Sequence, residues 1–144
     1  MRYVSSLLTR LRPSLGITIG LLIFLISLQG NLDAKMIAVI LGFGFIHLAG
    51  DIYNDITDIE EDKRNRRFEK MTLNGLFTSH DINLLAICSL LLGLILTLQA
   101  GAIWLILGIF YTCTLFLYSY KRVRLKARGV LGYFITFLPL FCCV

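Results

Sequence analysis

The stretch INLLAICSLLLGLILTLQAGAIWLILGIFYTCTLFLYSY, residues 82–120, decides the fold class, because its 39 consecutive residues include no Asp, Glu, Lys or Arg. About 20 apolar residues are enough for a helix to cross the hydrocarbon core of a bilayer. The stretch is therefore long enough for two membrane-spanning helices, and Gln99-Ala100-Gly101 near its middle predicts the turn between them. Asp81, which directly precedes the stretch, is the predicted N-cap of the first helix.

The same pattern extends over most of the chain. Three further uncharged runs have 20, 15 and 16 residues, and together the four runs include 90 of the 144 residues. The three further runs are residues 13–32, 36–50 and 129–144. We therefore expect an all-α fold, a polytopic transmembrane helical bundle that forms a single membrane domain over residues 1–144. About five spans are predicted. They lie at residues 14–29, 36–55, 82–98, 101–120 and 129–144.

The basic residues indicate how these spans are oriented. If every run crosses the membrane, 13 of the 14 Lys and Arg fall on one side and only Lys35 falls on the other. The clusters on the shared side are Arg2, Arg10 and Arg12; Lys63, Arg64, Arg66, Arg67 and Lys70; and Lys121, Arg122, Arg124, Lys126 and Arg128. Because basic loops concentrate in the cytoplasm, we expect an integral multi-pass membrane protein whose amino terminus and basic loops are cytoplasmic. The net charge of +5 then reflects topology, so the expected partner is the lipid bilayer and no nucleic acid.

The most informative polar segment is DIYNDITDIEED, residues 51–62, at the end of the second predicted span. We expect the helix of this span to continue through the segment, which places Asn54, Asp58 and Asp62 one turn apart on one face. Like charges at this spacing repel each other by about 0.2–0.5 kcal/mol per exposed pair. A bound cation would neutralise the face, and ligands that are all oxygen suit Mg²⁺ completed by substrate phosphates.

A solvated helix end with ordinary acidic side chains is the alternative interpretation of this segment. An EF-hand is excluded, because the central Gly of its loop is absent. Ionisable groups next to a membrane span usually mark a functional site, which favours the ligand interpretation.

The same span carries one His and three glycines. His47, four residues before Asp51, either lines the site or is satisfied by a neighbour within the apolar helix. Gly42, Gly44 and Gly50 predict close packing against other helices.

The segment from Asn54 to Asp62, N-D-x-x-D-x-x-x-D, resembles the first aspartate-rich motif of the UbiA-type intramembrane prenyltransferases. An Arg-Pro pair before the first span and a basic loop after the motif follow the same order as in that family. The loop keeps the family's Arg and Gly, as Arg67 and Gly75, and lacks its two prolines.

A second similarity follows the fourth predicted span. Tyr118-Ser119 and the stretch at residues 124–132 resemble the Y-S-x-P-P-x-R-L-K-x-R-G-x-x-G-N sequence of several family members. Lys121-Arg122 replaces the two prolines, and Tyr133 replaces the final Asn. The two motifs together extend the resemblance over essentially the whole chain.

The resemblance implies a fold of nine spans, of which this chain corresponds to the first half. It also implies transfer of a prenyl group from an isoprenoid diphosphate, bound with Mg²⁺, to an aromatic or other lipophilic acceptor. The resemblance implies that the catalytic residues are Asp55, Asp58 and Asp62. It implies that Mg²⁺ is bound by Asn54, Asp58 and Asp62, with Asp55 in support. The side chains that it implies for contact with the diphosphate are Arg67, Lys70, Tyr118 and Lys126.

The family's second aspartate-rich motif has no counterpart in these residues, because Glu69 and Asp81 are the only acids after Asp62. We therefore expect the activity to be incomplete in this chain, with a C-terminal half or a second subunit supplying the motif. The alternatives are a non-catalytic helical membrane subunit and an inactive truncated product. A CDP-alcohol phosphotransferase is set aside, because its Asp-Gly and Ala-Arg pairs do not precede the acids.

Overall fold

The structure, a computed structural model, is all-helical in the part of the chain that it describes. The described residues are 18–20, 23, 33–66, 77–120, 123, 125, 129–130 and 132. Their helices are α3 (Ala34–Thr57), α4 (Ile59–Arg64), α5 (Ser79–Ala100) and α6 (Ala102–Ser119). Because α3, α5 and α6 are long and apolar enough to cross a membrane, the predicted all-α membrane bundle is confirmed. The predicted spans at 14–29 and 129–144 lie almost wholly outside the described residues.

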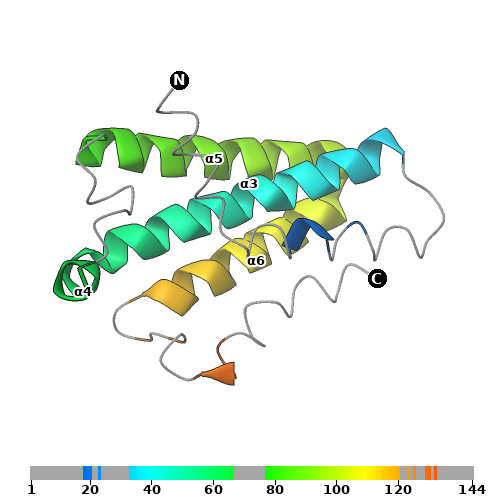
Figure 1. Ribbon diagram of the computed structural model, residues 1–144. Helices are drawn as coiled ribbons and strands as arrows, with labels where there is room; N and C mark the ends of the chain where they lie inside the picture. Colours follow the sequence, from blue (N-terminus) through cyan, green and yellow to red (C-terminus); the bar gives the residue numbers. More distant parts are fainter. Residues whose placement is uncertain are drawn as a thin grey trace.

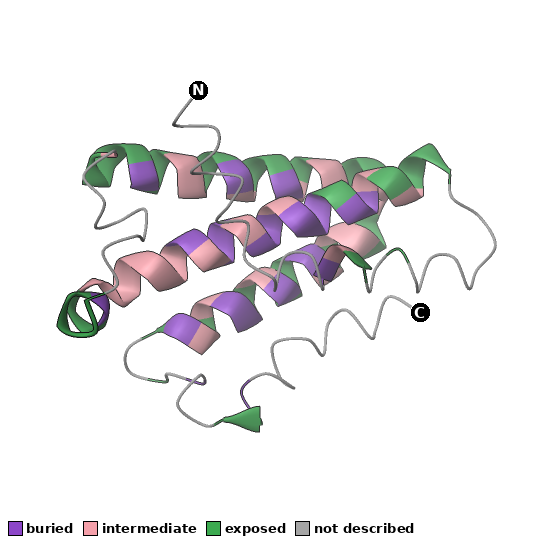
Figure 2. Ribbon diagram, viewed as in Figure 1, coloured by how far each residue is buried: buried purple, intermediate pink, exposed green. Residues whose placement is uncertain are grey.

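The three long helices pack side by side, with α3 between α5 and α6 (Figure 1). The chain runs in the same direction along α3 and α6 and in the opposite direction along α5. In the apolar part of α3, 56% of residues are buried, against 22% in α5 and 28% in α6. Figure 2 shows the same difference, with buried residues along α3 and many exposed residues along α5. α3 is thus the central helix of this group.

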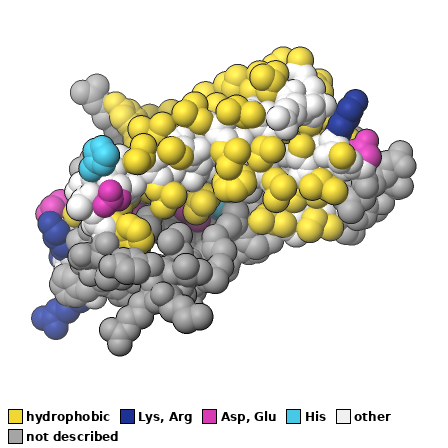
Figure 3. Space-filling model, turned by 90° about the horizontal axis from the view of Figure 1, so that it is seen from above, with side chains coloured by type: hydrophobic (Ala, Val, Ile, Leu, Met, Phe, Trp, Pro, Cys, Tyr) yellow, Lys and Arg dark blue, Asp and Glu magenta, His cyan; other side chains and the backbone are white. Residues whose placement is uncertain are grey.

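The outer faces of α5 and α6 are hydrophobic. Large exposed side chains on α5 recur every three or four residues and include Leu84, Ile87, Leu91 and Ile95. Figure 3, seen from the α5 side, shows hydrophobic side chains along the length of the group and charged ones near its two ends. Such a surface suits contact with lipid chains, as expected of an integral membrane protein.

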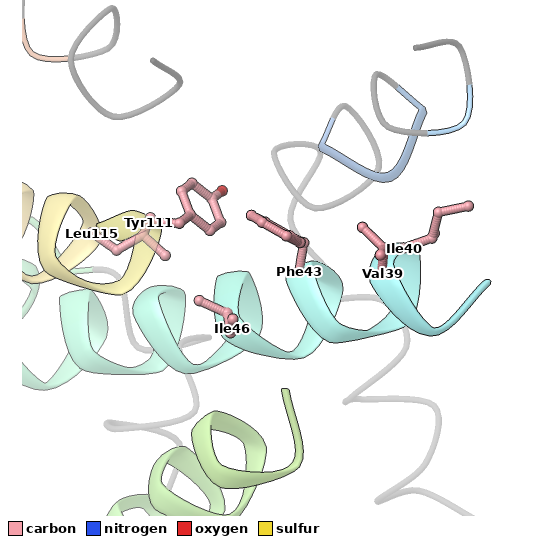
Figure 4. Close-up of a cluster of buried hydrophobic side chains, with 6 residues drawn as sticks. All are labelled: Val39, Ile40, Phe43, Ile46, Tyr111 and Leu115. Atoms are coloured by element: carbon pink, nitrogen blue, oxygen red, sulfur yellow. The ribbon is translucent and has the colours of Figure 1, made fainter. Parts of the chain in front are cut away.

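A core of buried side chains joins α3 to α6 (Figure 4). α3 contributes Val39, Ile40, Phe43 and Ile46, and α6 contributes Tyr111 and Leu115. The rings of Phe43 and Tyr111 are tilted against each other, with centroids 5.5 Å apart. This aromatic contact adds about 0.5–1.5 kcal/mol to the packing of the two helices.

Glycines allow the helices to approach closely. A Cβ atom on Gly42 would lie 2.8 Å from Thr97 Cγ2 on α5, and one on Gly50 would lie 2.9 Å from Leu115 Cδ1 on α6. The prediction of close packing is thus confirmed at Gly42 and Gly50. At Gly44 the prediction is not confirmed: among the described residues, a Cβ would make an ordinary contact of 3.6 Å with Ile19.

The ends of α5 are set by local hydrogen bonds. Thr78, not Asp81, is the N-cap: its hydroxyl oxygen accepts from Asp81 N at 3.2 Å, and the Asp81 carboxylate accepts from Thr78 N at 3.0 Å. The predicted cap was wrong because this reciprocal pair satisfies two orphan N–H groups and so begins the helix three residues earlier. α5 and α6 are separated at Gly101, whose φ of 137° lies in a region that L side chains rarely adopt.

Replacing Gly93 with Ala should destabilise the packing of α3 against α5. The new Cβ would lie 2.7 Å from Gly42 O and 2.8 Å from Ile46 Cγ1, so the helices must separate. We expect a loss of about 1–3 kcal/mol, measured as a lower Tm in detergent. Gly20→Ala is the matched control, because nothing in the described part of the chain lies within 4 Å of that position. Equal Tm values for the two variants would contradict the close helix crossing.

Candidate functional site

The acidic segment lies at the end of α3 and in α4. α3 ends at Thr57, Asp58 has φ −98° and ψ 2°, and α4 runs from Ile59 to Arg64. Figure 1 shows α4 almost end-on where α3 is seen from the side, so the chain changes direction between them. The expectation of one continuous helix through Asp62 is therefore wrong at Asp58.

The hydroxyl of Thr57 bonds back to its own helix at this break. Thr57 Oγ1 donates to Asn54 O at 2.9 Å, and the same carbonyl also accepts from Asp58 N at 3.1 Å. Thr side chains that bond back to their own helix in this way compete with the backbone ladder and often bend the helix. Asp62 N still donates to Asp58 O at 2.8 Å, so the four-residue backbone spacing of Asn54, Asp58 and Asp62 is kept across the bend.

The motif residues differ in exposure. Asn54, Asp55 and Asp58 are half-buried, whereas Asp62 is only 2% exposed, although its neighbour Glu61 is exposed. The acids in the first turn of α4 lie at the positive end of the helix dipole, which favours them there. Asp58 makes no side-chain cap to α4.

One hydrogen bond joins the acidic segment to the end of α6. Ser119 Oγ donates to Asn54 Oδ1 at 2.9 Å, and Ser119 is 2% exposed. Asn54 belongs to the first motif and Ser119 to the second, so the structure brings the two motifs together. Sequence reasoning did not place Ser119 in the site, although it quoted the residue beside Tyr118 as part of the second motif.

The remaining predicted site residues are only partly described. Tyr118, next to Ser119, is half-buried. Arg67, Lys70 and Lys126, expected to contact a diphosphate, lie outside the described residues.

His47 belongs to a buried polar cluster between α3 and α6. Its Nδ1 lies 2.6 Å from the Tyr111 hydroxyl oxygen and 3.4 Å from Thr18 Oγ1, and the His47 side chain is 4% exposed. Its Nε2 lies 3.8 Å from Asp51 Oδ2. At Nδ1, the geometry supports the interpretation in which neighbours satisfy His47.

The side chains near the bend offer oxygen atoms, which are the ligands that a hard divalent cation prefers. Among the described residues, no three His, Cys, Asp or Glu side chains are grouped as a metal site. The set that the resemblance implies is different, with one carboxamide oxygen from Asn54 and carboxylates from Asp58 and Asp62. Oxygen donors of this kind are those that Mg²⁺ takes, with waters and substrate phosphates in the other positions.

Replacing Tyr111 with Phe should destabilise the α3–α6 interface, because it leaves the buried His47 Nδ1 without its 2.6 Å partner. We expect a loss of about 1–3 kcal/mol, seen as a lower Tm. Tyr120→Phe is the control, since Tyr120 is 44% exposed. The double variant His47→Leu with Tyr111→Phe should recover part of the lost stability, because it removes both polar groups of the pair from the buried interface. A Tyr111→Phe variant as stable as the control would contradict the role of this pair.

Comparison with known proteins agrees with the resemblance of the motifs. The description of the matching family model is the UbiA prenyltransferase family, and the match extends over residues 15–144. No curated protein and no solved structure gave a significant match. A match over nearly the whole chain, with the two motifs meeting at Asn54 and Ser119, shows that the chain belongs to the UbiA prenyltransferase family.

Proposed function

We propose that this chain binds the diphosphate group of an isoprenoid diphosphate, with Mg²⁺, at the acidic end of α3 and α4. In the complete reaction, the prenyl group passes to an aromatic or other lipophilic acceptor. The observation that carries the proposal is the meeting of the two motifs through Asn54 and Ser119 in a chain of this family. Family membership supports the reaction class, and the motif residues support the site.

Electrostatics explain why the proposed site combines acids with a cation. A diphosphate is strongly negative, so carboxylates alone would repel it. Mg²⁺ bound to oxygens of Asn54, Asp58 and Asp62 would stabilise the negative charge that develops on the leaving diphosphate. Asp55, half-buried beside Asn54, is proposed to support this group.

Basic and phenolic side chains complete the proposal. Arg67, Lys70 and Lys126 would contact the outer diphosphate oxygens, and Tyr118 would donate a hydrogen bond from the end of α6. Positive groups aimed at the leaving diphosphate stabilise charge as the allylic C–O bond breaks. The buried Ile52 and Leu115 adjoin this end of the bundle, and apolar surroundings of this kind exclude water from a reactive prenyl cation.

The orientation of the site in the membrane is also a proposal. α4, the first turn of α5 and the last turn of α6 lie at one end of the helix group, whereas Asp33 and Gly101 lie at the other (Figure 1). Lys63 and Arg64 lie at the first of these ends. We propose that this end faces the cytoplasm, where basic loops concentrate.

Asp58→Asn should weaken Mg²⁺-dependent binding of inorganic pyrophosphate, which stands for the diphosphate group, by at least about tenfold. Removing one carboxylate leaves the proposed cation site with less negative charge. Equilibrium dialysis of the full chain in detergent, with Mg²⁺ and with EDTA, measures the effect. Asp33→Asn is the matched control: it is the same change at the other end of α3, and Asn can still cap the helix.

The outcomes separate the competing interpretations of the chain. Pyrophosphate binding that needs Mg²⁺ and is lost only in Asp58→Asn supports the proposal. Equal binding in both variants would refute the site. Failure of the unaltered chain to bind pyrophosphate would favour a non-catalytic membrane subunit.

Single cysteines should report the proposed orientation. In a chain whose four native Cys are replaced by Ala, Lys35→Cys and Asn65→Cys place thiols at opposite ends of the α3–α4 pair. Both positions are exposed. A membrane-impermeant maleimide added to intact cells should label Lys35→Cys at once and Asn65→Cys only after permeabilisation. The reverse pattern would show that the acidic end faces outward.

A further inference from the structure

We propose that Ser119 is a positioning residue that orients the Asn54 carboxamide toward the bound cation. This inference rests on the proposed function, since it assigns a role within the same site. Ser119 does not touch the cation or the diphosphate in this proposal; it acts through Asn54.

The hydrogen bond determines which end of the carboxamide is presented. Ser119 Oγ donates to Asn54 Oδ1 at 2.9 Å, which identifies the oxygen end as the one held by α6. A carboxamide oxygen has two lone pairs, so it can accept from Ser119 and still bind a cation. Without the hydroxyl, the amide can turn by 180° and present its NH₂ group, which cannot bind a cation.

Backbone hydrogen bonds keep Asn54, Asp58 and Asp62 at a four-residue spacing beside Ser119. The Asn54 carbonyl accepts from both Thr57 Oγ1 and Asp58 N, and the Asp58 carbonyl accepts from Asp62 N. Ser119 therefore contacts the first of three proposed ligands whose backbones are joined by helical hydrogen bonds.

Packing between α3 and α6 holds Ser119 in place. Contacts recur along the two parallel helices: His47 meets Tyr111, Gly50 meets Leu115, and Asn54 meets Ser119. Next to Asn54 in sequence, Tyr53 packs on Phe116 of α6, with ring centroids 4.4 Å apart. Ser119 is thus buried beside a well-packed interface, so its hydroxyl has a defined position.

The threonine hydroxyls at residues 112 and 114 of α6 behave differently from that of Ser119. Thr112 Oγ1 donates to Gly108 O at 2.8 Å, and Thr114 Oγ1 donates to Tyr111 O at 2.8 Å, both within their own helix. The Ser119 hydroxyl instead crosses to α3 and meets a motif side chain. This difference provides a control on the same helix.

The test measures the Mg²⁺ dependence of pyrophosphate binding rather than activity. In Ser119→Ala, the Mg²⁺ concentration that gives half-maximal binding of inorganic pyrophosphate should rise about tenfold, as is typical when an outer partner of a metal ligand is removed. Ser119→Thr keeps the hydroxyl and should restore the dependence of the unaltered chain. Thr112→Ala removes a hydroxyl that bonds only within α6, and the Mg²⁺ dependence should stay unchanged.

A second background separates orientation of Asn54 from general stability. In Asn54→Asp, both side-chain oxygens can bind a cation, so no hydroxyl is needed to select one of them. Adding Ser119→Ala to this background should change the half-maximal Mg²⁺ concentration by less than about twofold. A merely structural role of Ser119 would give the same loss in both backgrounds.

Each outcome decides between the two proposals. If the unaltered chain binds pyrophosphate with Mg²⁺ and Asp58→Asn does not, but Ser119→Ala matches Thr112→Ala, the positioning role is overturned and the proposed function stands. An equal loss on adding Ser119→Ala to the unaltered chain and to the Asn54→Asp variant also overturns the positioning role. If the unaltered chain does not bind pyrophosphate, the proposed function fails, and this inference fails with it.

Discussion

The contact between the parallel helices α3 and α6 is the constraint on which the rest of the described structure depends. Near its middle, the His47–Tyr111 pair buries polar groups that must stay together, and Gly50 lets Leu115 approach the α3 backbone. At one end, Ser119 reaches Asn54. Because unsatisfied polar groups are costly in an apolar interior, the first pair fixes the register of the two helices. That register decides which residue of α6 meets the acidic segment.

Packing against α5 completes the group by a different physical means. Lipid chains are as apolar as helix surfaces, so burial of hydrophobic area drives helix association only weakly within a membrane. Gly42 and Gly93 instead let the backbones of α3 and α5 come close enough for dispersion contacts. The outer face of α5 carries a row of exposed Leu and Ile side chains, a surface that suits contact with lipid. α3 therefore receives neighbours on two sides, and its polar end is held in a defined place.

Sequence reasoning found the elements but misjudged some of their ends and contacts. The helical membrane class and close packing at two glycines were predictable, since uncharged length and small residues act locally. The bend at Asp58 was not, because a threonine that bonds back to its own helix also fits a continuous helix, as Thr114 does in α6. The start of α5 was misplaced because Thr78 and Asp81 cap each other, a pairing that the position of Asp81 alone does not reveal. The role of Ser119 was not predictable, because the place of its hydroxyl beside Asn54 depends on how α6 packs against α3.

The sequence by itself determined that this is a helical membrane protein and that Asn54, Asp58 and Asp62 form its candidate site. Both properties follow from the local sequence. A long uncharged run must form a helix in lipid, and acidic side chains next to such a run need a partner that offsets their negative charge. Only the tertiary structure decided that α6 supplies the partner of Asn54 and that the acidic segment bends. The partner of Asn54 depends on a contact between residues 65 positions apart. The bend depends on which hydrogen bonds the packed helices form.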